Sequence, residues 1–296
     1  MSDPTGKPFI VVGYDQSPSG DRALAVAGRE AAWRGTGVIV VNAFHWAPVT
    51  NPVAYFPVDI EASLKEYADE VAGAGADWLR RRYPGMAVAS EAVPGPTGQM
   101  LADAARNAEL LVLGNRGLGG FAGLLLGSVS MRTLTLASCP TMVVRGTPRE
   151  GAGPVILALD IAEAADEVVE FAFAEAAGRA AGVLAIHAWD PEWTGMADLE
   201  ADDGLRTART RTTMVRRAAV ESLVGPWQWE YPGVRLTVEI AEGSPGAVLT
   251  AATRTADLIV TGAHRRGDGW PEMRLGPIVH TLLHHADCPL AVVPGK

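Results

Sequence analysis

The amino-acid sequence contains an internal repeat that covers almost the whole chain. Residues 127–145 read GSVSMRTLTLASCPTMVVR, and residues 276–294 read GPIVHTLLHHADCPLAVVP. Two further pairs of segments match in the same order, namely 9–15 with 155–160 and 98–116 with 246–264. Self-similarity of this kind indicates one folding unit that occurs twice, so each half predicts the structure of the other.

The repeat divides the chain into two domains. Its 296 residues are about twice the usual domain length. The stretch RGTPREGAGP at 145–154 is rich in glycine and proline and carries charge, which is typical of a linker. We therefore expect one domain over residues 1–147 and a second over residues 152–296.

Within each half, short apolar segments alternate with longer segments of helical character. The run FIVVG, for example, is short and β-branched, as buried strands are. In the first half the predicted strands are 9–13, 37–44, 86–92, 110–114 and 140–145. The first predicted helix is capped by Ser17 or Ser19 and ends near Arg34. The other predicted helices are 60–82, 97–107 and 127–137. The second half repeats this order.

This alternation predicts the fold class. Strands that alternate with helices form βαβ crossovers and a mostly parallel sheet. Because such crossovers are right-handed, the expected fold is α/β and doubly wound, with helices on both faces of each sheet. Ligands of such sheets bind at the carboxyl ends of the strands, so we expect a functional site there.

Composition excludes several classes of protein. Lysine and arginine number 25 against 34 acidic residues, a net charge of −9, which argues against a nucleic-acid partner. The sequence has no apolar run near the roughly 18 residues of a membrane span and no apolar leader at its start, so we expect a cytoplasmic protein. The two cysteines, Cys139 and Cys288, precede matching final strands and are expected to be buried, unreactive thiols.

One loop of the first half has the residues of an anion site. It reads G-x-x-G-x9-G-S, from Gly114 to Ser128, after a strand and before a helix. Gly114 and Gly117 allow a positive φ and let a ligand approach the backbone closely. Gly127 and Ser128 open a helix, whose free N–H groups and dipole favour an anion. Arg116 can place a cation beside phosphate oxygens.

Asp15 is a second candidate in the first half, with two interpretations. It follows the first strand and therefore lies at the same sheet edge as the glycine loop. Its carboxylate can accept a hydrogen bond from a ribose hydroxyl or help to hold a metal ion on a polyphosphate. Alternatively, Asp-x-Ser after a strand is a common cap and turn.

These motifs resemble the universal stress proteins, and the loop spacing resembles their ATP-binding branch. The resemblance rests on VVGYDQS, the glycine loop and the closing S-C-P-x-x-V-V strand, and it covers both halves. It implies five-stranded sheets of order 3-2-1-4-5, bound ATP with Mg²⁺, and a homo-oligomer, as a dimer. It also implies that the edges of the final strands pair two domains, which a tandem chain can do internally. It assigns no metal ligand to the protein. The implied ATP-binding residues are Asp15, Ala43, Leu113, Gly114, Arg116, Gly117, Gly127, Ser128, Val129 and Ser130.

The second half departs from this pattern. The corresponding residues of a possible second site are Asp160, Ala188, Gly262, Arg265 and Gly276. Arg265 stands where the first half has Gly117, and Pro277 replaces Ser128, which removes a backbone N–H and a hydroxyl. Three outcomes stay open for this half: ATP bound weakly or differently, no nucleotide, or another anion.

Three functions are compatible with the motifs. The first is a nucleotide-dependent regulator of stress response or growth that binds ATP and acts through an unknown protein partner. The second is a slow ATPase or nucleotidyl transferase on the same scaffold. The sequence shows no Walker A loop and no evident general base beside the glycine loop, which argues against this second function. The third is a nucleotide-free interaction module.

Overall fold

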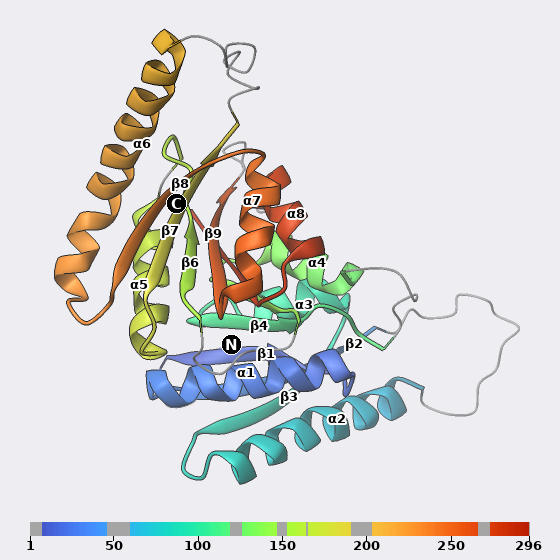
Figure 1. The fold of residues 1–296 in the computed structure, drawn as a ribbon. Helices are drawn as coiled ribbons and strands as arrows, with labels where there is room; N and C mark the ends of the chain where they lie inside the picture. Colours follow the sequence, from blue (N-terminus) through green and yellow to red (C-terminus); the bar gives the residue numbers. More distant parts are fainter. Residues whose placement is uncertain are drawn as a thin grey trace, which may run out of the picture. The chain divides into compact units, whose positions relative to one another are not determined.

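The computed structural model describes residues 8–45, 60–118, 126–146, 153–163, 165–190, 203–265 and 273–295. The chain divides into two compact units, with the break between Val144 and Arg145. Each unit is an α/β domain built on parallel strands (Figure 1).

The first unit contains a five-stranded parallel sheet. Its strands are β1 (Phe9–Gly13), β2 (Gly37–Phe44), β3 (Val88–Pro94), β4 (Leu110–Gly114) and β5 (Thr141–Val144). Their order in the sheet is β3-β2-β1-β4-β5, and all neighbours are parallel. This is the order that the resemblance implied. The predicted third strand, 86–92, is shifted by two residues from β3.

Helices cover both faces of this sheet. They are α1 (Pro18–Arg34), α2 (Ile60–Arg82), α3 (Thr97–Ala104) and α4 (Ser128–Leu136). Helices α1 and α2 pack against each other on one face, and α3 packs against α4 on the other (Figure 1). The prediction 97–107 was too long for α3, which ends at Ala104.

The local chemistry of the sequence explains where α1 begins and ends. Ser17 caps the helix, because its side chain accepts a hydrogen bond from Gly20 N, and Pro18 occupies the first turn. Gly35 ends the helix in the left-handed conformation, with φ of 67°. Between these ends, the buried face of α1 covers the core strand β1, in which Ile10, Val11 and Val12 are fully buried.

The second unit repeats the architecture. Its strands are β6 (Val155–Ala158), β7 (Val183–Trp189), β8 (Leu236–Glu242), β9 (Leu258–Arg265), the short β10 (Met273–Arg274) and β11 (Leu290–Pro294). The order β8-β7-β6-β9-β11 is again that of the first sheet, with parallel neighbours, and β10 pairs with β9. The internal repeat is therefore a repeat of the fold.

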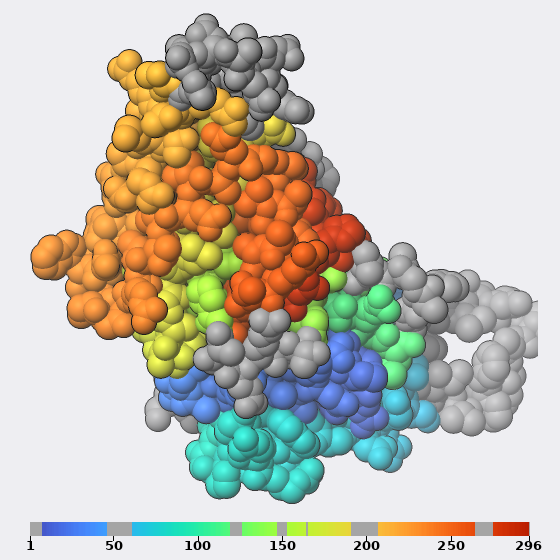
Figure 2. Space-filling model, viewed as in Figure 1, coloured from blue at the N-terminus to red at the C-terminus, as the bar shows by residue number. Residues whose placement is uncertain are grey.

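The helices of the second unit are arranged as in the first. They are α5 (Asp166–Gly178), α6 (Asp203–Glu230), α7 (Pro245–Ala252) and α8 (Pro277–His285), with a short 3-10 helix at Thr253–Thr255. Helix α5 packs against α6, and α7 packs against α8. In the space-filling view α2 (cyan) and α6 (gold to orange) each form part of the surface of their own unit (Figure 2).

Candidate functional site

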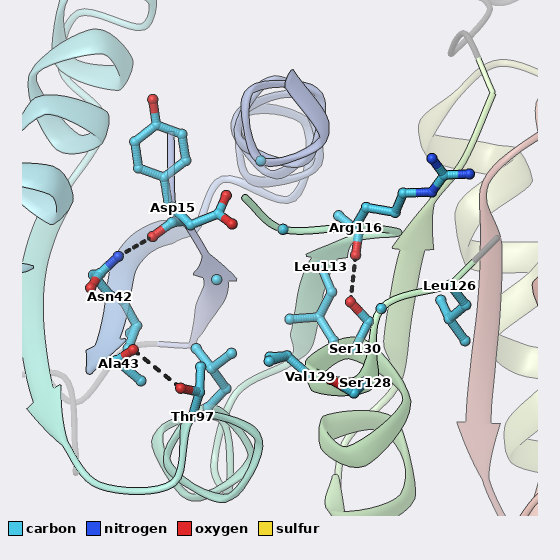
Figure 3. Close-up of a pocket in the computed structure, with 18 residues that line it drawn as sticks. Asp15, Asn42, Ala43, Thr97, Leu113, Arg116, Leu126, Ser128, Val129 and Ser130 are labelled. Carbon is cyan, nitrogen blue, oxygen red and sulfur yellow. Dashed lines mark hydrogen bonds between the residues drawn. The ribbon is translucent and has the colours of Figure 1, made fainter. Parts of the chain in front are cut away.

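A pocket of about 440 Å³ lies at the carboxyl ends of β1, β2 and β4 in the first unit (Figure 3). Every residue predicted for the first-half site lines it: Asp15, Ala43, Leu113, Gly114, Arg116, Gly117, Gly127, Ser128, Val129 and Ser130. Its volume is within the range of small-molecule sites in proteins. The structure thus brings the predicted residues together in one cavity, while their contact with ATP stays a prediction.

The pocket also includes residues outside that predicted set. These are Gly13, Tyr14, Gly20, Val41, Asn42, Thr97, Leu101 and Leu126. Thr97 and Leu101 belong to α3, and Thr97 donates a hydrogen bond from Oγ1 to Ala43 O over 3.4 Å. Asn42 donates from Nδ2 to Tyr14 O over 2.7 Å. Only the sheet order 3-2-1-4-5 shows that the start of α3 lies beside the end of β2.

Asp15 joins the end of β1 to the glycine loop. Its Oδ1 accepts a hydrogen bond from Ser17 N over 3.0 Å, which is the local turn considered above. Its Oδ2 accepts from Leu118 N over 3.1 Å, across a separation of 103 residues. The carboxylate therefore makes the turn and also holds the loop, and its proposed contact with a nucleoside would be additional to both.

The two glycines of the loop have a steric role that the sequence did not predict. Neither Gly114 nor Gly117 has a positive φ, so that expectation was wrong. Space is the reason instead. A Cβ on Gly114 would lie 2.8 Å from both the carbonyl carbon and the carbonyl oxygen of Ser19, and a Cβ on Gly117 would lie 2.6 Å from Asp15 Oδ2. Glycine here permits the close approach of α1 and Asp15 to the loop.

Helix α4 begins at the wall of the pocket. Its N-cap is Gly127, with φ of −77°, and the helix has no side-chain cap there. An α-helix leaves its first N–H groups without intrahelical acceptors, here those of Ser128, Val129 and Ser130, and its dipole makes this end partly positive. The Ser130 hydroxyl donates to Gly114 O over 2.7 Å and so ties the helix to the end of β4. The arrangement suits an anion.

The Arg116 side chain does not point into the centre of the pocket. Figure 3 shows its guanidinium directed away from Asp15 and Ser128. Its backbone is held instead, because Arg116 O accepts from Ser17 Oγ and Arg116 N donates to Ser19 Oγ. The guanidinium would have to turn to reach a phosphate in this pocket.

Tyr14 also lines the pocket, and its phenol is bound to α1. Its hydroxyl donates to Asp21 Oδ1 over 2.9 Å. Burial, followed by the hydrogen bond to Asp21 and the charges of Asp21 and Asp15, raises the pKa of Tyr14 to about 12. Among the described residues that line the pocket, Asp15 is the only carboxylate.

The candidates of the second unit lie at the corresponding sheet edge. Asp160 follows β6 and its Oδ1 accepts from Ala162 N over 3.0 Å, and Ala188 and Gly262 lie in β7 and β9. Gly276 is the N-cap of α8, with Pro277 as the first helical residue. Arg265 ends β9, and its side chain lies outside the described part of the structure.

A different group of side chains stands beside these candidates. His187 stands at the position that corresponds to Asn42. Its Nδ1 lies 3.0 Å from Leu159 O, a contact equivalent to that of Asn42 with Tyr14 O. Its Nε2 lies 2.9 Å from Arg216 Nη1, and the Arg216 guanidinium lies 4.8 Å from the centroid of the Trp189 ring. Because Nε2 faces a cation, it is the acceptor and Nδ1 carries the proton.

Two absences apply to the described part of the protein. No group of three or more histidine, cysteine or acidic side chains there could hold a metal ion. The helices described are also too short or too polar to cross a lipid bilayer.

Comparisons with known proteins agree with this fold. The sequence profile of the Universal stress protein family matches residues 9–145 and 152–294. A universal stress protein of Mycobacterium tuberculosis is 30% identical over 303 residues, covering 99% of this chain and 98% of that protein. One from Mycolicibacterium smegmatis is 28% identical over 291 residues, covering 96% of each. The chain belongs to the universal stress protein family, as a tandem of two such domains.

Solved structures show the same fold. The crystal structure of a universal stress protein from Archaeoglobus fulgidus matches with a TM-score of 0.69 and 20% identity, covering 97% of this chain and 98% of that one. A universal stress protein in complex with cAMP matches 47% of this chain with 27% identity and a TM-score of 0.35. That second likeness is too low to inform the ligand of this chain.

Proposed function

We propose that the first unit binds ATP and that the protein is a nucleotide-dependent regulator. The observation that carries this proposal is the start of α4, where Gly127 and three N–H groups without intrahelical acceptors border the pocket. The end of β2 forms the opposite wall and would receive the adenine ring at Ala43. In the same proposal, the protein is a cytoplasmic homodimer and acts through a regulatory protein partner.

The donor groups of the pocket suit a magnesium–triphosphate. With Asp15 as the only carboxylate among the described lining residues, the protein offers no cluster of metal ligands. We therefore expect Mg²⁺ to be held mainly by phosphate oxygens, which it prefers together with water, and to lower the charge of the triphosphate.

Binding is better supported than catalysis. Asp15 is the one acidic group at the described pocket wall, and both of its oxygens already accept amide hydrogen bonds. Each oxygen keeps a second lone pair, and we assign these to the ribose, which leaves no described carboxylate at the pocket wall as general base for an attacking water. Any hydrolysis of ATP is therefore expected to be slow.

The variant Gly127→Ala tests this proposal. At φ of −77° alanine is tolerated, and its Cβ would lie 3.6 Å from Arg116 Cα and Asn115 O, an ordinary contact. The methyl group would stand between the loop and the start of α4, where we place the phosphates. Losing charge-assisted hydrogen bonds there should weaken ATP binding by about tenfold or more.

The measurement is calorimetric titration with Mg-ATP, beside a thermal melt of each variant. Gly73→Ala on α2 is the matched control, since a Cβ there meets no atom within 4 Å. Both variants should melt at or above the wild-type temperature, and only Gly127→Ala should lose affinity. Wild-type protein that binds no ATP, or a Gly127→Ala variant that binds it normally, would contradict the assignment.

A further inference from the structure

The first helices of the two units begin at different places. Asp15 corresponds to Asp160, so Pro18, the first residue of α1, corresponds to Glu163. Helix α5 nevertheless begins only at Asp166, with Ala165 as an N-cap that makes no side-chain hydrogen bond. The first unit therefore has an additional first turn of helix, residues 18–20, and this turn borders the glycine loop.

Ser17 makes that additional turn and holds the loop with one hydroxyl. Its Oγ accepts from Gly20 N over 3.0 Å, which caps α1. The same Oγ donates to Arg116 O over 3.3 Å. Ser17 is 3% exposed, so water cannot take the place of these hydrogen-bond partners. Losing either hydrogen bond therefore costs free energy.

Ser19 makes the second pair of contacts between α1 and the loop. Its Oγ donates to Asn115 Oδ1 over 2.8 Å and accepts from Arg116 N over 3.2 Å. Ser19 is 5% exposed. Both polar backbone atoms of Arg116 are therefore bound to serine hydroxyls, which fixes the orientation of the two peptide units that flank it.

The restraint continues to the start of α4. Gly127 N donates to Asn115 O over 2.8 Å, so the two ends of the glycine loop are joined to each other. Fixing Asn115 and Arg116 therefore also fixes the N-cap of the helix whose N–H groups border the pocket. A binding site formed by backbone amides needs such a restraint, because a mobile loop loses entropy when it closes on an anion.

The second unit has none of these hydroxyls. Ala162 stands at the position of Ser17, and Ala164 at that of Ser19. Among the described residues, a Cβ on Gly262, the counterpart of Gly114, would meet a methyl group of Val168 at 3.1 Å. The hydroxyl contacts of Ser17 and Ser19 therefore have no counterpart in the sequence of the second unit.

We propose that Ser17 and Ser19 are positioning residues that hold Asn115, Arg116 and Gly127 in the conformation that receives the phosphates of ATP. This inference rests on the proposed function and deepens it. The two hydroxyls touch the loop and not the nucleotide. They should therefore affect the binding of the triphosphate and leave the binding of the adenosine moiety at the end of β2 almost unchanged.

The test compares Mg-ATP and adenosine as ligands of two variants. Ser19→Ala leaves Arg116 N without its acceptor and should weaken ATP binding about tenfold, with adenosine within about twofold of wild type. Ser17→Asp keeps the cap of α1, since a carboxylate accepts from Gly20 N, but cannot donate to Arg116 O. Ser17→Asp should weaken ATP binding by a similar factor. Ser17→Thr, which keeps the hydroxyl, should bind ATP like wild type.

Amide hydrogen exchange supplies a readout of the restraint itself. The Arg116 amide should exchange faster in Ser19→Ala than in wild type, while amides of β3 keep their rates. If Ser19→Ala binds ATP like wild type, or loses ATP and adenosine equally, the positioning role is wrong although the proposed function stands. If wild-type protein binds neither ligand, the proposed function fails and the positioning role fails with it.

Discussion

At the scale of single residues, close packing explains why the loop has glycine at positions 114 and 117. Gly114 lies against the backbone of Ser19, and Gly117 lies against the carboxylate of Asp15. The spacing G-x-x-G identified both residues correctly as special. Their reason was not visible in the sequence, because Ser19 and Asp15 are distant along the chain and reach the loop only through the order of the strands.

Gly114→Ala is expected to destabilise the first unit. Its Cβ would lie 2.6 Å from Ser19 Oγ and 2.8 Å from two backbone atoms that cannot rotate away. Overpacking of this kind costs about 2 kcal/mol of unfolding free energy. Urea denaturation measures the loss. Gly262→Ala is the matched control, because the one contact of its Cβ with the described residues is a side-chain methyl at 3.1 Å. An equal loss in both variants would refute the explanation.

Both cysteines are expected to be unreactive in the folded protein. Burial raises the pKa of the Cys139 thiol to about 12, and burial followed by the charges of Asp257 and Asp287 raises the pKa of Cys288 to about 12. An aromatic disulfide reagent at neutral pH should therefore label them only after unfolding. Rapid labelling of the native protein would contradict this.

The same two shifts predict the direction of an alkaline effect on stability. The unfolded chain releases these protons near the ordinary thiol pKa of 9.0, and the folded protein holds them to about 12. The unfolded state therefore binds fewer protons between these values, and the unfolding free energy falls as pH rises through them. Replacing both cysteines with alanine should reduce that slope in urea denaturation.

At the scale of elements, the first helix of each unit contains a buried ion pair. Glu30 accepts from Arg34 over 2.6 Å, and Glu175 accepts from Arg179 over 3.0 Å, each four residues apart. The glutamate side chains are 3% and 0% exposed. Helical spacing predicts that such residues can meet, but only the packed helix shows that they are buried.

Arg179→Met is expected to destabilise the second unit. It leaves the charge of Glu175 buried without this arginine, which costs about 3 kcal/mol. Lys65→Met is the control, because Lys65 and Asp69 form an exposed pair at the same spacing whose loss costs at most about 0.5 kcal/mol. Chemical denaturation of both variants measures the difference, and similar losses would show that burial does not matter here.

At the scale of the whole molecule, the two copies of the fold differ at the positions of the proposed site. Pro277 has no N–H at the start of α8, and the second unit lacks the serine hydroxyls that hold the loop in the first. His187 and Arg216 further change the end of β7. The family resemblance alone left nucleotide binding in this half open, and these differences favour a single tight site.

We therefore expect one ATP per protein molecule. Equilibrium dialysis at ATP concentrations well above the dissociation constant should give a stoichiometry near one, and the Gly127→Ala variant should lose that site. Two equivalent sites in wild-type protein would show that neither Pro277 nor the missing hydroxyls weaken the second unit.

The sequence by itself determined the repeat, the alternation of strands and helices, and most residues of the pocket. Apolar periodicity, helix caps and glycine spacing are local, and they act within a few residues. The tertiary structure alone decided that Asp15 accepts from Leu118 N, that Thr97 reaches Ala43 and that Ser19 holds Arg116. Those contacts join residues far apart in the sequence, and they exist because a parallel sheet of order 3-2-1-4-5 gathers the carboxyl ends of its strands at one edge.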